Sequence, residues 1–377
     1  MGIRKGILLL ACLLLLTGVC SAMDLALPPD AVSVSERGPV LFTGSAVTVN
    51  GTDLTKCGRI KKVDCVELGE LCEALDTVWV WNDDKGGLRW KGKWITLREG
   101  VGGFFYGDRW CKLPIGPAVA KDGVYVPVEA LCKGLDIGYL YDAEKFHAYV
   151  TPAAGAWEIP EGVRVPTLMY HGVADTEWWG SLELFVHPDD LEAQLQYLTE
   201  NGYTPIWFED LERVDEIEKP VLLTFDDGYV DNYTELFPLL QKYQVKATIF
   251  VIAGTVDWNP NNLNGKQIKE MSDSGLVSIQ SHTQTHPDLY LLDREAQEWE
   301  LDYSKLTLTR LTGKIPYVIC YPSGNTNADT LELAEKHYRM GVDMGNYWYT
   351  TGEDPYLVRR WYVSRSTTLG AFAQLVA

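Results

Sequence analysis

The sequence predicts an α/β fold in which parallel strands and crossover helices form a sheet or a barrel, preceded by a smaller α+β unit. Short apolar runs alternate with amphipathic helical patterns across residues 160–377, which is typical of parallel strands joined by helices. A helix and strand pattern also occurs twice in the first third of the chain. Apolar residues make up 46 % of the chain, enough to bury real cores and to argue against a disordered protein.

The N-terminus has the pattern of a secretory signal peptide. Arg4 and Lys5 precede an unbroken apolar run, Ile7–Leu16, and small residues follow for cleavage at Cys20–Ala22. The run is too short to span a bilayer comfortably, and no second hydrophobic stretch follows it. We therefore expect residues 1–22 to be a signal peptide and the mature chain to have no transmembrane segment. Val19, where a small residue would be expected, argues against lipidation of Cys20, although that alternative stays open.

Residues 66–83 and 126–143 form an internal repeat. Cys72 of the first copy matches Cys132 of the second, and each copy indicates a short helix that leads into an aromatic-rich strand. We expect both cysteines to be buried structural thiols. Five of the six cysteines after the signal peptide lie in the first third, an odd number that cannot pair completely, so one or two disulfides stay open as an alternative.

A linker of small residues, Thr151–Ala156, separates the repeat from the second region. A helix is expected to open at His187, because Pro188 and two acidic residues follow in what would be its first turn. The apolar runs predict strands at Val165–Tyr170, Val221–Phe225, Ala247–Ile252, Val277–Gln280 and Tyr317–Tyr321.

Unusual polar residues follow two of these strands, at the strand ends where functional side chains gather in such folds. Asp226 and Asp227 follow one strand, and His282 and His286 follow another. In a helical turn, two histidines four apart would lie on one face and could share a metal ion. One carboxylate and two neutral imidazoles leave open positions on a divalent cation, and the second carboxylate can then take a proton from water. The spacing is not that of an HExxH metalloprotease, because no glutamate follows the first histidine.

The stretches TFDDGY (224–229) and SHTQTHPDL (281–289) resemble the first two motifs of the NodB-homology polysaccharide deacetylases, carbohydrate esterase family 4. Residues 165–173, 321–324 and 357–363 also fit the extracellular bacterial branch of that family. The resemblance covers residues 160–377 and implies a distorted (β/α) barrel of parallel strands. It implies Asp226 as general base, and Asp227, His282 and His286 as ligands of a divalent metal, zinc by default, with cobalt, nickel or iron as alternatives.

The sequence departs from this family in two places. The motif that supplies an arginine to the catalytic aspartate is replaced by Ile319–Pro322, so Arg360 becomes the candidate substitute, with an ordinary ion pair as the alternative. No histidine follows His337 to act as the general acid. His171, at the end of the first strand, resembles the closing motif moved to the front of the domain, as in the poly-N-acetylglucosamine deacetylase branch. A structural histidine is the alternative.

Two further features bear on the reaction. We expect the backbone N–H of Tyr321 to help stabilise the oxyanion that forms in the reaction. Two aromatic groups, Trp178-Trp179 and Tyr347–Tyr349, either stack on sugar rings or pack in the core.

Residues 41–152 resemble the copper amine oxidase N-terminal-like stalk domain of Gram-positive surface proteins. The patterns at Val47–Gly51 and Val124–Leu131 carry this resemblance, which is diffuse. His147 is the only histidine of the region, and one imidazole does not make a copper site. The implied role is that of a spacer or of a module that binds cell-wall glycan.

These features predict a secreted or cell-surface, Gram-positive bacterial enzyme that removes N-acetyl groups from N-acetylglucosamine-containing polysaccharide, either peptidoglycan or an exopolysaccharide. The formal charge of −19 argues against nucleic acid and anionic membranes as partners. A glycosidase would need two carboxylates flanking the bond rather than a metal site. An O-acetyl esterase acting on a glycan such as xylan, and a catalytically silent wall-binding protein, are the alternatives.

Overall fold

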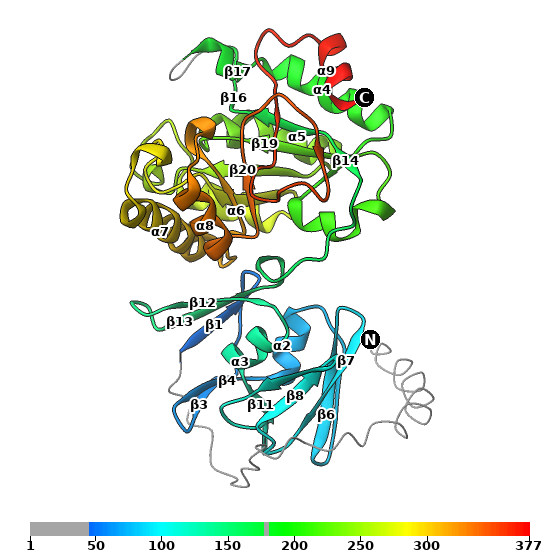
Figure 1. The fold of residues 1–377 in the computed structure, drawn as a ribbon, viewed down its shortest axis with the longest axis vertical. Helices are drawn as coiled ribbons and strands as arrows, with labels where there is room; N and C mark the ends of the chain where they lie inside the picture. Colours follow the sequence, from blue (N-terminus) through cyan, green and yellow to red (C-terminus); the bar gives the residue numbers. More distant parts are fainter. Residues whose placement is uncertain (1–44, 177–180) are drawn as a thin grey trace, which may run out of the picture.

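The computed structural model describes residues 45–176 and 181–377. The predicted signal peptide, Cys20 and the Trp178-Trp179 pair lie outside these residues. Figure 1 shows two bodies along the long axis, which we call the N-terminal unit (residues 45–156) and the barrel (residues 164–377). Within the described ranges, no helix is both long and apolar enough to cross a membrane.

The N-terminal unit consists of small sheets around two short helices. One sheet has the order β12 (Gly138–Asp142), β13 (His147–Thr151), β1 (Ala46–Val49), β2 (Thr52–Asp53). A second sheet has the order β10 (Ala118–Ala120), β11 (Gly123–Pro127), β4 (Val63–Glu67), β3 (Cys57–Ile60). Two antiparallel sheets complete the unit, formed by β5 (Trp79–Asn82), β6 (Lys85–Trp90) and β7 (Lys93–Arg98), and by β8 (Gly103–Tyr106) and β9 (Arg109–Lys112).

The internal repeat is confirmed as a structural repeat. Helix α2 (Leu68–Ala74) leads into β5, and helix α3 (Val128–Gly134) leads into β12, so each copy is a short helix followed by an aromatic-rich strand. Cys72 and Cys132 are both buried in the core of the unit, as predicted. All six cysteines in the described part of the chain are free thiols, so the alternative of disulfides is not realised there.

The barrel is built on one curled sheet of parallel strands. Its order is β23 (Met340–Val342), β22 (Val318–Cys320), β21 (Val277–Ser281), β20 (Ala247–Val251), β19 (Pro220–Phe225), β15 (Thr167–Tyr170), β25 (Trp361–Tyr362), and β18 (Thr204–Ile206) also pairs with β19. Around it lie α4 (Pro188–Glu200), α5 (Phe237–Tyr243), α6 (Gly265–Asp273), α7 (Arg294–Thr312), α8 (Ala328–His337) and α9 (Leu369–Val376). The helix capped by His187 and the predicted strands are confirmed, except that the expected strand Val165–Tyr170 is divided. Its first residue belongs to β14 (Arg164–Val165), which pairs with β24 (Tyr349–Thr350) in a separate sheet, and Thr167–Tyr170 form β15.

A single short segment, residues 358–362, connects the two edges of the sheet. Val358 forms a parallel bridge to Val342 of the edge strand β23, and Trp361 pairs with Leu168 of β15. The sheet therefore curls into the distorted barrel that the sequence predicts. Arg360 lies between Val358 and Trp361 in this segment. Closure of the barrel therefore determines where the Arg360 side chain lies inside it.

The N-terminal unit contacts the barrel at the end where the parallel strands begin. Ile315, which precedes β22, donates its N–H to Thr151 Oγ1 at 2.9 Å, and Arg339, which precedes β23, donates to the Ala154 carbonyl at 3.0 Å. Arg310 of α7 forms a bidentate ion pair with the buried Asp142 of β12, at 2.6 and 2.8 Å. The candidate site lies at the opposite end of the barrel, where the parallel strands terminate.

Candidate active site

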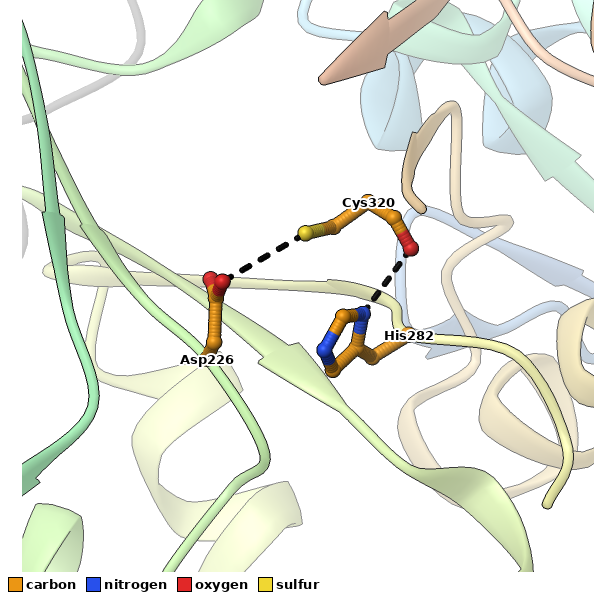
Figure 2. Close-up of side chains that lie close together, drawn as sticks. All are labelled: Asp226, His282 and Cys320. Carbon is orange, nitrogen blue, oxygen red and sulfur yellow. Dashed lines mark hydrogen bonds between the residues drawn. The ribbon is translucent and has the colours of Figure 1, made fainter. Parts of the chain in front are cut away.

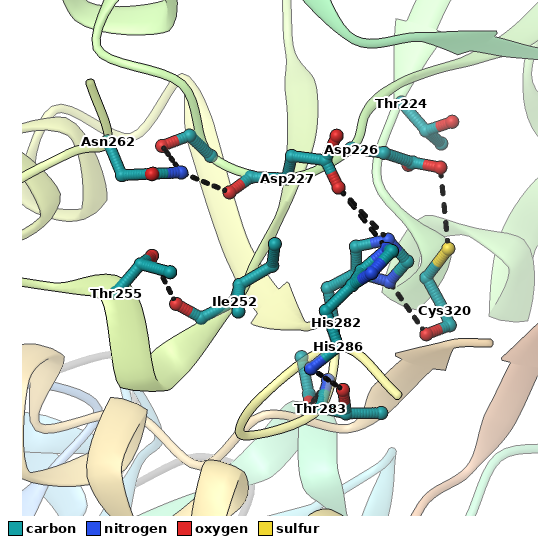
Figure 3. A network of polar contacts seen from close by, with 12 residues as sticks. Thr224, Asp226, Asp227, Ile252, Thr255, Asn262, His282, Thr283, His286 and Cys320 are labelled. Atoms are coloured by element: carbon teal, nitrogen blue, oxygen red, sulfur yellow. Dashed lines mark hydrogen bonds and ion pairs between the residues drawn. The ribbon is translucent and has the colours of Figure 1, made fainter. Parts of the chain in front are cut away.

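Asp226 and Asp227 follow directly after β19, in a turn that requires left-handed backbone. Asp227 has φ = 72° and Gly228 has φ = 66°, a conformation that glycine adopts freely and aspartate tolerates. The Asn262 side chain stabilises this turn by donating to the carbonyls of Asp227 and Gly228, at 3.0 and 3.3 Å (Figure 3). The turn thereby directs two neighbouring carboxylates to different partners.

His282 and His286 follow β21. They do not lie on a helical turn, so the expectation that such a turn would place both imidazoles on one face is wrong. Thr283 and His286 have positive φ angles, 66° and 63°, and the resulting loop brings the two rings to 4.7 Å between centroids. The buried Glu300 of α7 stabilises the loop by accepting from the backbone N–H groups of Gln284 and Thr285, both at 2.8 Å. Sequence reasoning missed Glu300, because its position in a long helix carries no signal of this role.

The side chains of Asp227, His282 and His286 converge. Asp227 Oδ1 lies 3.4 Å from His282 Nε2 and 3.5 Å from His286 Nε2. Tetrahedral ligands about 2.1 Å from one zinc ion lie about 3.4 Å from one another, so this spacing fits a shared ion. His282 donates its Nδ1–H to the Cys320 carbonyl at 2.8 Å, which leaves the Nε2 lone pair free for a metal. The three residues can hold a divalent cation.

Charge also favours a cation here. Burial by itself raises the pKa of Asp227, but the hydrogen bond that Asp227 shares with His282 opposes burial, and the net pKa lies below its usual value. The carboxyl is therefore ionised at neutral pH. His286 is the accessible member of the set, with its side chain 36 % exposed.

Asp226 turns the other way and forms a bidentate ion pair with Arg360. The Asp226 oxygens lie 2.7 and 2.8 Å from the two terminal nitrogens of the guanidinium, and Arg360 is only 1 % exposed. Burial raises the pKa of Asp226, but the charge and hydrogen bonds of Arg360 outweigh it and the net pKa is lowered. Asp226 is thus a buried carboxylate that can accept a proton. The structure places Arg360 where the sequence analysis expected the substitute for the missing arginine.

Comparison with known proteins agrees with this geometry. A family model described as polysaccharide deacetylase matches residues 213–341. The chain is 33 % identical over 228 residues to YxkH of Bacillus subtilis (strain 168), which bears the name of a polysaccharide deacetylase, and the match covers 59 % of this chain and 79 % of that protein. The chain belongs to the polysaccharide deacetylase family. The deacetylase is therefore an enzyme of the hydrolase class.

Other relatives and one solved structure extend this comparison. The deacetylase is 26 % identical over 223 residues to the poly-β-1,6-N-acetyl-D-glucosamine N-deacetylase of Escherichia coli (strain K12), covering 47 % of this chain and 33 % of that one. It is 26 % identical over 209 residues to the peptidoglycan-N-acetylglucosamine deacetylase of Bacillus cereus, covering 54 % and 72 %. The structure of the Streptococcus pyogenes deacetylase PplD in complex with acetate aligns with a TM-score of 0.54 and 31 % identity, covering 57 % of this chain and 99 % of that one.

Cys320 of the deacetylase is a site residue that sequence reasoning passed over. Its thiol donates to Asp226 Oδ2 at 3.5 Å, while its carbonyl accepts from His282 (Figure 2). Asp226, His282 and Cys320 also lie close enough to hold an ion. However, Arg360 already neutralises Asp226, and His282 Nδ1 is engaged by the Cys320 carbonyl. Burial raises the pKa of the Cys320 thiol, so it stays protonated.

His171 lies at the neighbouring strand end. Tyr170 pairs with Phe225, and Asp226 donates its N–H to the Tyr170 carbonyl at 2.9 Å, so His171 and Asp226 leave adjacent strands at the same level. The His171 Nδ1 atom is buried and has no hydrogen-bond partner among the described residues. Burial lowers the pKa of His171, although the charges of Asp226 and Asp227 oppose this effect.

Two neighbouring residues determine the backbone position of His171. Asn232 donates its Nδ2 to the His171 carbonyl at 3.0 Å and to Asp231 Oδ1 at 3.1 Å. The same Asp231 oxygen accepts the N–H of Val173 at 2.9 Å. The segment that carries His171 is therefore anchored at the His171 carbonyl and at Val173.

The expected role of Tyr321 towards the oxyanion stays a prediction. Its N–H donates to the Val342 carbonyl at 3.1 Å within the sheet, and its hydroxyl donates to the Tyr356 carbonyl at 3.0 Å, so an oxyanion would compete with the Val342 carbonyl for this N–H. Two alternatives were open for the aromatic stretch 347–349, stacking on sugar rings or packing in the core, and its residues differ in which they fit. Tyr349 is buried, Trp348 packs against Trp361, and only Tyr347 is largely exposed, at 53 %.

Proposed function

We propose that the deacetylase removes N-acetyl groups from an N-acetylglucosamine-containing polysaccharide in a metal-dependent reaction. The observation that carries this proposal is the adjacency of a two-histidine, one-carboxylate set to a second, arginine-paired carboxylate at one end of the barrel. The relatives named for poly-β-1,6-N-acetyl-D-glucosamine and for peptidoglycan N-acetylglucosamine support an exopolysaccharide or peptidoglycan as the polymer.

Asp227, His282 and His286 are the residues that would hold the metal. Imidazole and carboxylate ligands with open positions favour zinc, with cobalt, nickel or iron as alternatives. A divalent cation in this site would polarise the acetyl carbonyl and increase the acidity of the attacking water.

Proton transfer in the reaction falls to Asp226 and His171. The Asp226 carboxylate, kept ionised by Arg360, takes a proton from the water that attacks the acetyl carbon. His171 donates a proton to the amide nitrogen as the carbon–nitrogen bond breaks, so that acetate and a free sugar amine are released. The anchoring of the His171 backbone by Asn232 supports this role, because an acid must keep a fixed distance from the leaving group.

We also propose that residues 1–22 direct export, which would place the enzyme outside a Gram-positive cell or at its surface. Residues 41–152 would act as a stalk that spaces the catalytic region, residues 160–377, from the wall or binds wall glycan. The attachment of the N-terminal unit at the end of the barrel opposite the site supports this arrangement, since it leaves the site open to a polymer.

Acetate release from purified enzyme tests the proposed function. A panel should pair N-acetylated substrates, namely poly-N-acetylglucosamine, peptidoglycan and chitin fragments, with O-acetylated xylan. We expect chelator-sensitive release from at least one N-acetylated substrate and little from xylan. Release from xylan alone would favour the O-acetyl esterase, and no release from any substrate by metal-loaded enzyme would favour a silent wall-binding protein.

A further inference from the structure

The Arg360 guanidinium has every one of its N–H donors engaged. Arginine carries five N–H donors, and acceptors are present for all of them. Nε donates to the Asp343 carbonyl at 3.2 Å and Nη1 donates to Thr224 Oγ1 at 3.0 Å. The two bonds to Asp226 use one hydrogen on each terminal nitrogen. The last donor, on Nη2, goes to Cys320 Sγ at 3.1 Å.

This last bond matters because water cannot replace it. Arg360 is 1 % exposed and Cys320 is fully buried, so loss of the sulfur would leave a charged N–H without an acceptor. A buried donor that loses its acceptor is destabilised, and more so when it is charged. The guanidinium would be expected to rotate or shift toward another acceptor, and such a movement would break the two-point contact with Asp226.

We propose that Cys320 is a positioning residue that acts through Arg360 to fix the orientation of the Asp226 carboxylate. The inference rests on the proposed function, in which Asp226 takes the proton from water. The thiol contacts both members of the pair, accepting from Arg360 and donating to Asp226 Oδ2 at 3.5 Å. A side chain at position 320 therefore needs an atom that both accepts and donates a hydrogen bond.

Cys320 also contacts the metal half of the site, but through its backbone. The carbonyl of Cys320 accepts the Nδ1–H of His282, and a side-chain substitution leaves that carbonyl in place (Figure 2). Side-chain variants at position 320 should therefore change proton transfer without changing metal content. This separation distinguishes the proposal from a general collapse of the site.

Kinetics of two variants test the proposal. Cys320→Ala should lower kcat about tenfold with KM and metal content unchanged, because it leaves the Arg360 donor without an acceptor. Cys320→Ser should recover a large part of that loss, since a hydroxyl accepts and donates. Cys132→Ala, at a buried thiol of the N-terminal unit, serves as the control and should leave kcat unchanged. Equal kcat for Cys320→Ala and wild type, or equal losses for the Ala and Ser variants, would overturn the proposal.

A double-mutant cycle with Arg360→Lys tests whether Cys320 acts through the arginine. Lysine keeps the positive charge but lacks the two terminal nitrogens of the guanidinium. Arg360→Lys should therefore lower kcat and the stability to urea, and adding Cys320→Ala to it should cause little further loss of either. Additive losses would overturn the proposal. The urea-unfolding measurements need no substrate, so they decide the inference even if wild type releases no acetate. Absence of acetate release from wild type would count only against the proposed function.

Discussion

Arg360 and Asp226 lie 134 positions apart in the sequence and form a bidentate ion pair inside the barrel. The pair exists because the segment 358–362 connects the two edges of the curled sheet and carries the arginine past the end of β19. Both partners are almost fully buried, so each neutralises a charge that water does not reach. The segment that closes the barrel therefore also brings Arg360 to Asp226, the proposed proton acceptor.

Removing the arginine should destabilise the protein. Arg360→Met leaves Asp226 buried and uncompensated, and loss of one partner of a buried ion pair typically costs about 3–5 kcal/mol of unfolding free energy. Urea unfolding measures this change. Arg294→Met is the matched control, because Arg294 pairs with Asp329 and Glu332 at the surface, where such pairs contribute about 0–1 kcal/mol. Similar losses in the two variants would contradict the role given to the buried pair.

Metal content should depend on His286. His286→Ala removes one of the three proposed ligands, the His286 Nε2 atom, which lies 3.5 Å from Asp227 Oδ1. Elemental analysis should show loss of the bound ion, and acetate release should be lost with it. The fold should survive, because this side chain is partly exposed. His337→Ala, which removes a histidine paired with Glu298 on α7, should keep the metal. Unchanged metal in His286→Ala would refute the ligand set.

His171 should matter more for amides than for activated esters. His171→Ala should lower turnover of an N-acetylated oligosaccharide about 10²–10⁴-fold, the usual contribution of a general acid. An aryl acetate has a leaving group that needs little protonation, so its hydrolysis should change far less. Asp226→Asn should impair both reactions, since both need the activated water. Equal losses on the two substrates in His171→Ala, or loss of metal, would exclude the role of acid.

Asp231 should make stability depend on pH. It is buried, one carboxyl oxygen has no hydrogen-bond partner in the described part of the chain, and burial raises its pKa from 3.8 to about 7. The folded state therefore holds a proton between these values that the unfolded state releases, and stability falls as pH rises through this window. Asp231→Asn should raise the melting temperature more at pH 8 than at pH 5. Asp189→Asn, at an exposed site, should not alter the pH slope.

The catalytic chemistry should not need the N-terminal unit. A fragment of residues 160–377 should fold with a lower melting temperature, because it loses the contacts of Arg310 with Asp142 and of Ile315 with Thr151. It should keep most of its activity on short soluble oligosaccharides, since these contacts lie at the strand beginnings rather than at the site. A folded fragment without activity would show that the N-terminal unit contributes to the site.

The sequence by itself determined the elements and the candidate site residues of this protein. Alternating apolar and helical patterns predicted the parallel strands, because burial of a strand and of a helix face leaves a local period in the chain. The sequence also made four candidate site residues recognisable, namely Asp226, Asp227, His282 and His286. They belong to short motifs, and each motif lies at the end of a strand.

Only the tertiary structure decided how these groups are held. No local signal connects Cys320 to Asp226, and Arg360 was a candidate partner only through the family resemblance, because both contacts depend on how the sheet closes. The loop of His282 and His286 is stabilised by Glu300 from another element rather than by a helical turn. The partner of the Tyr321 N–H, the Val342 carbonyl, belongs to a neighbouring strand, which no local pattern indicates. Local patterns report burial and residue type, whereas hydrogen-bond partners distant in sequence follow from strand order and closure.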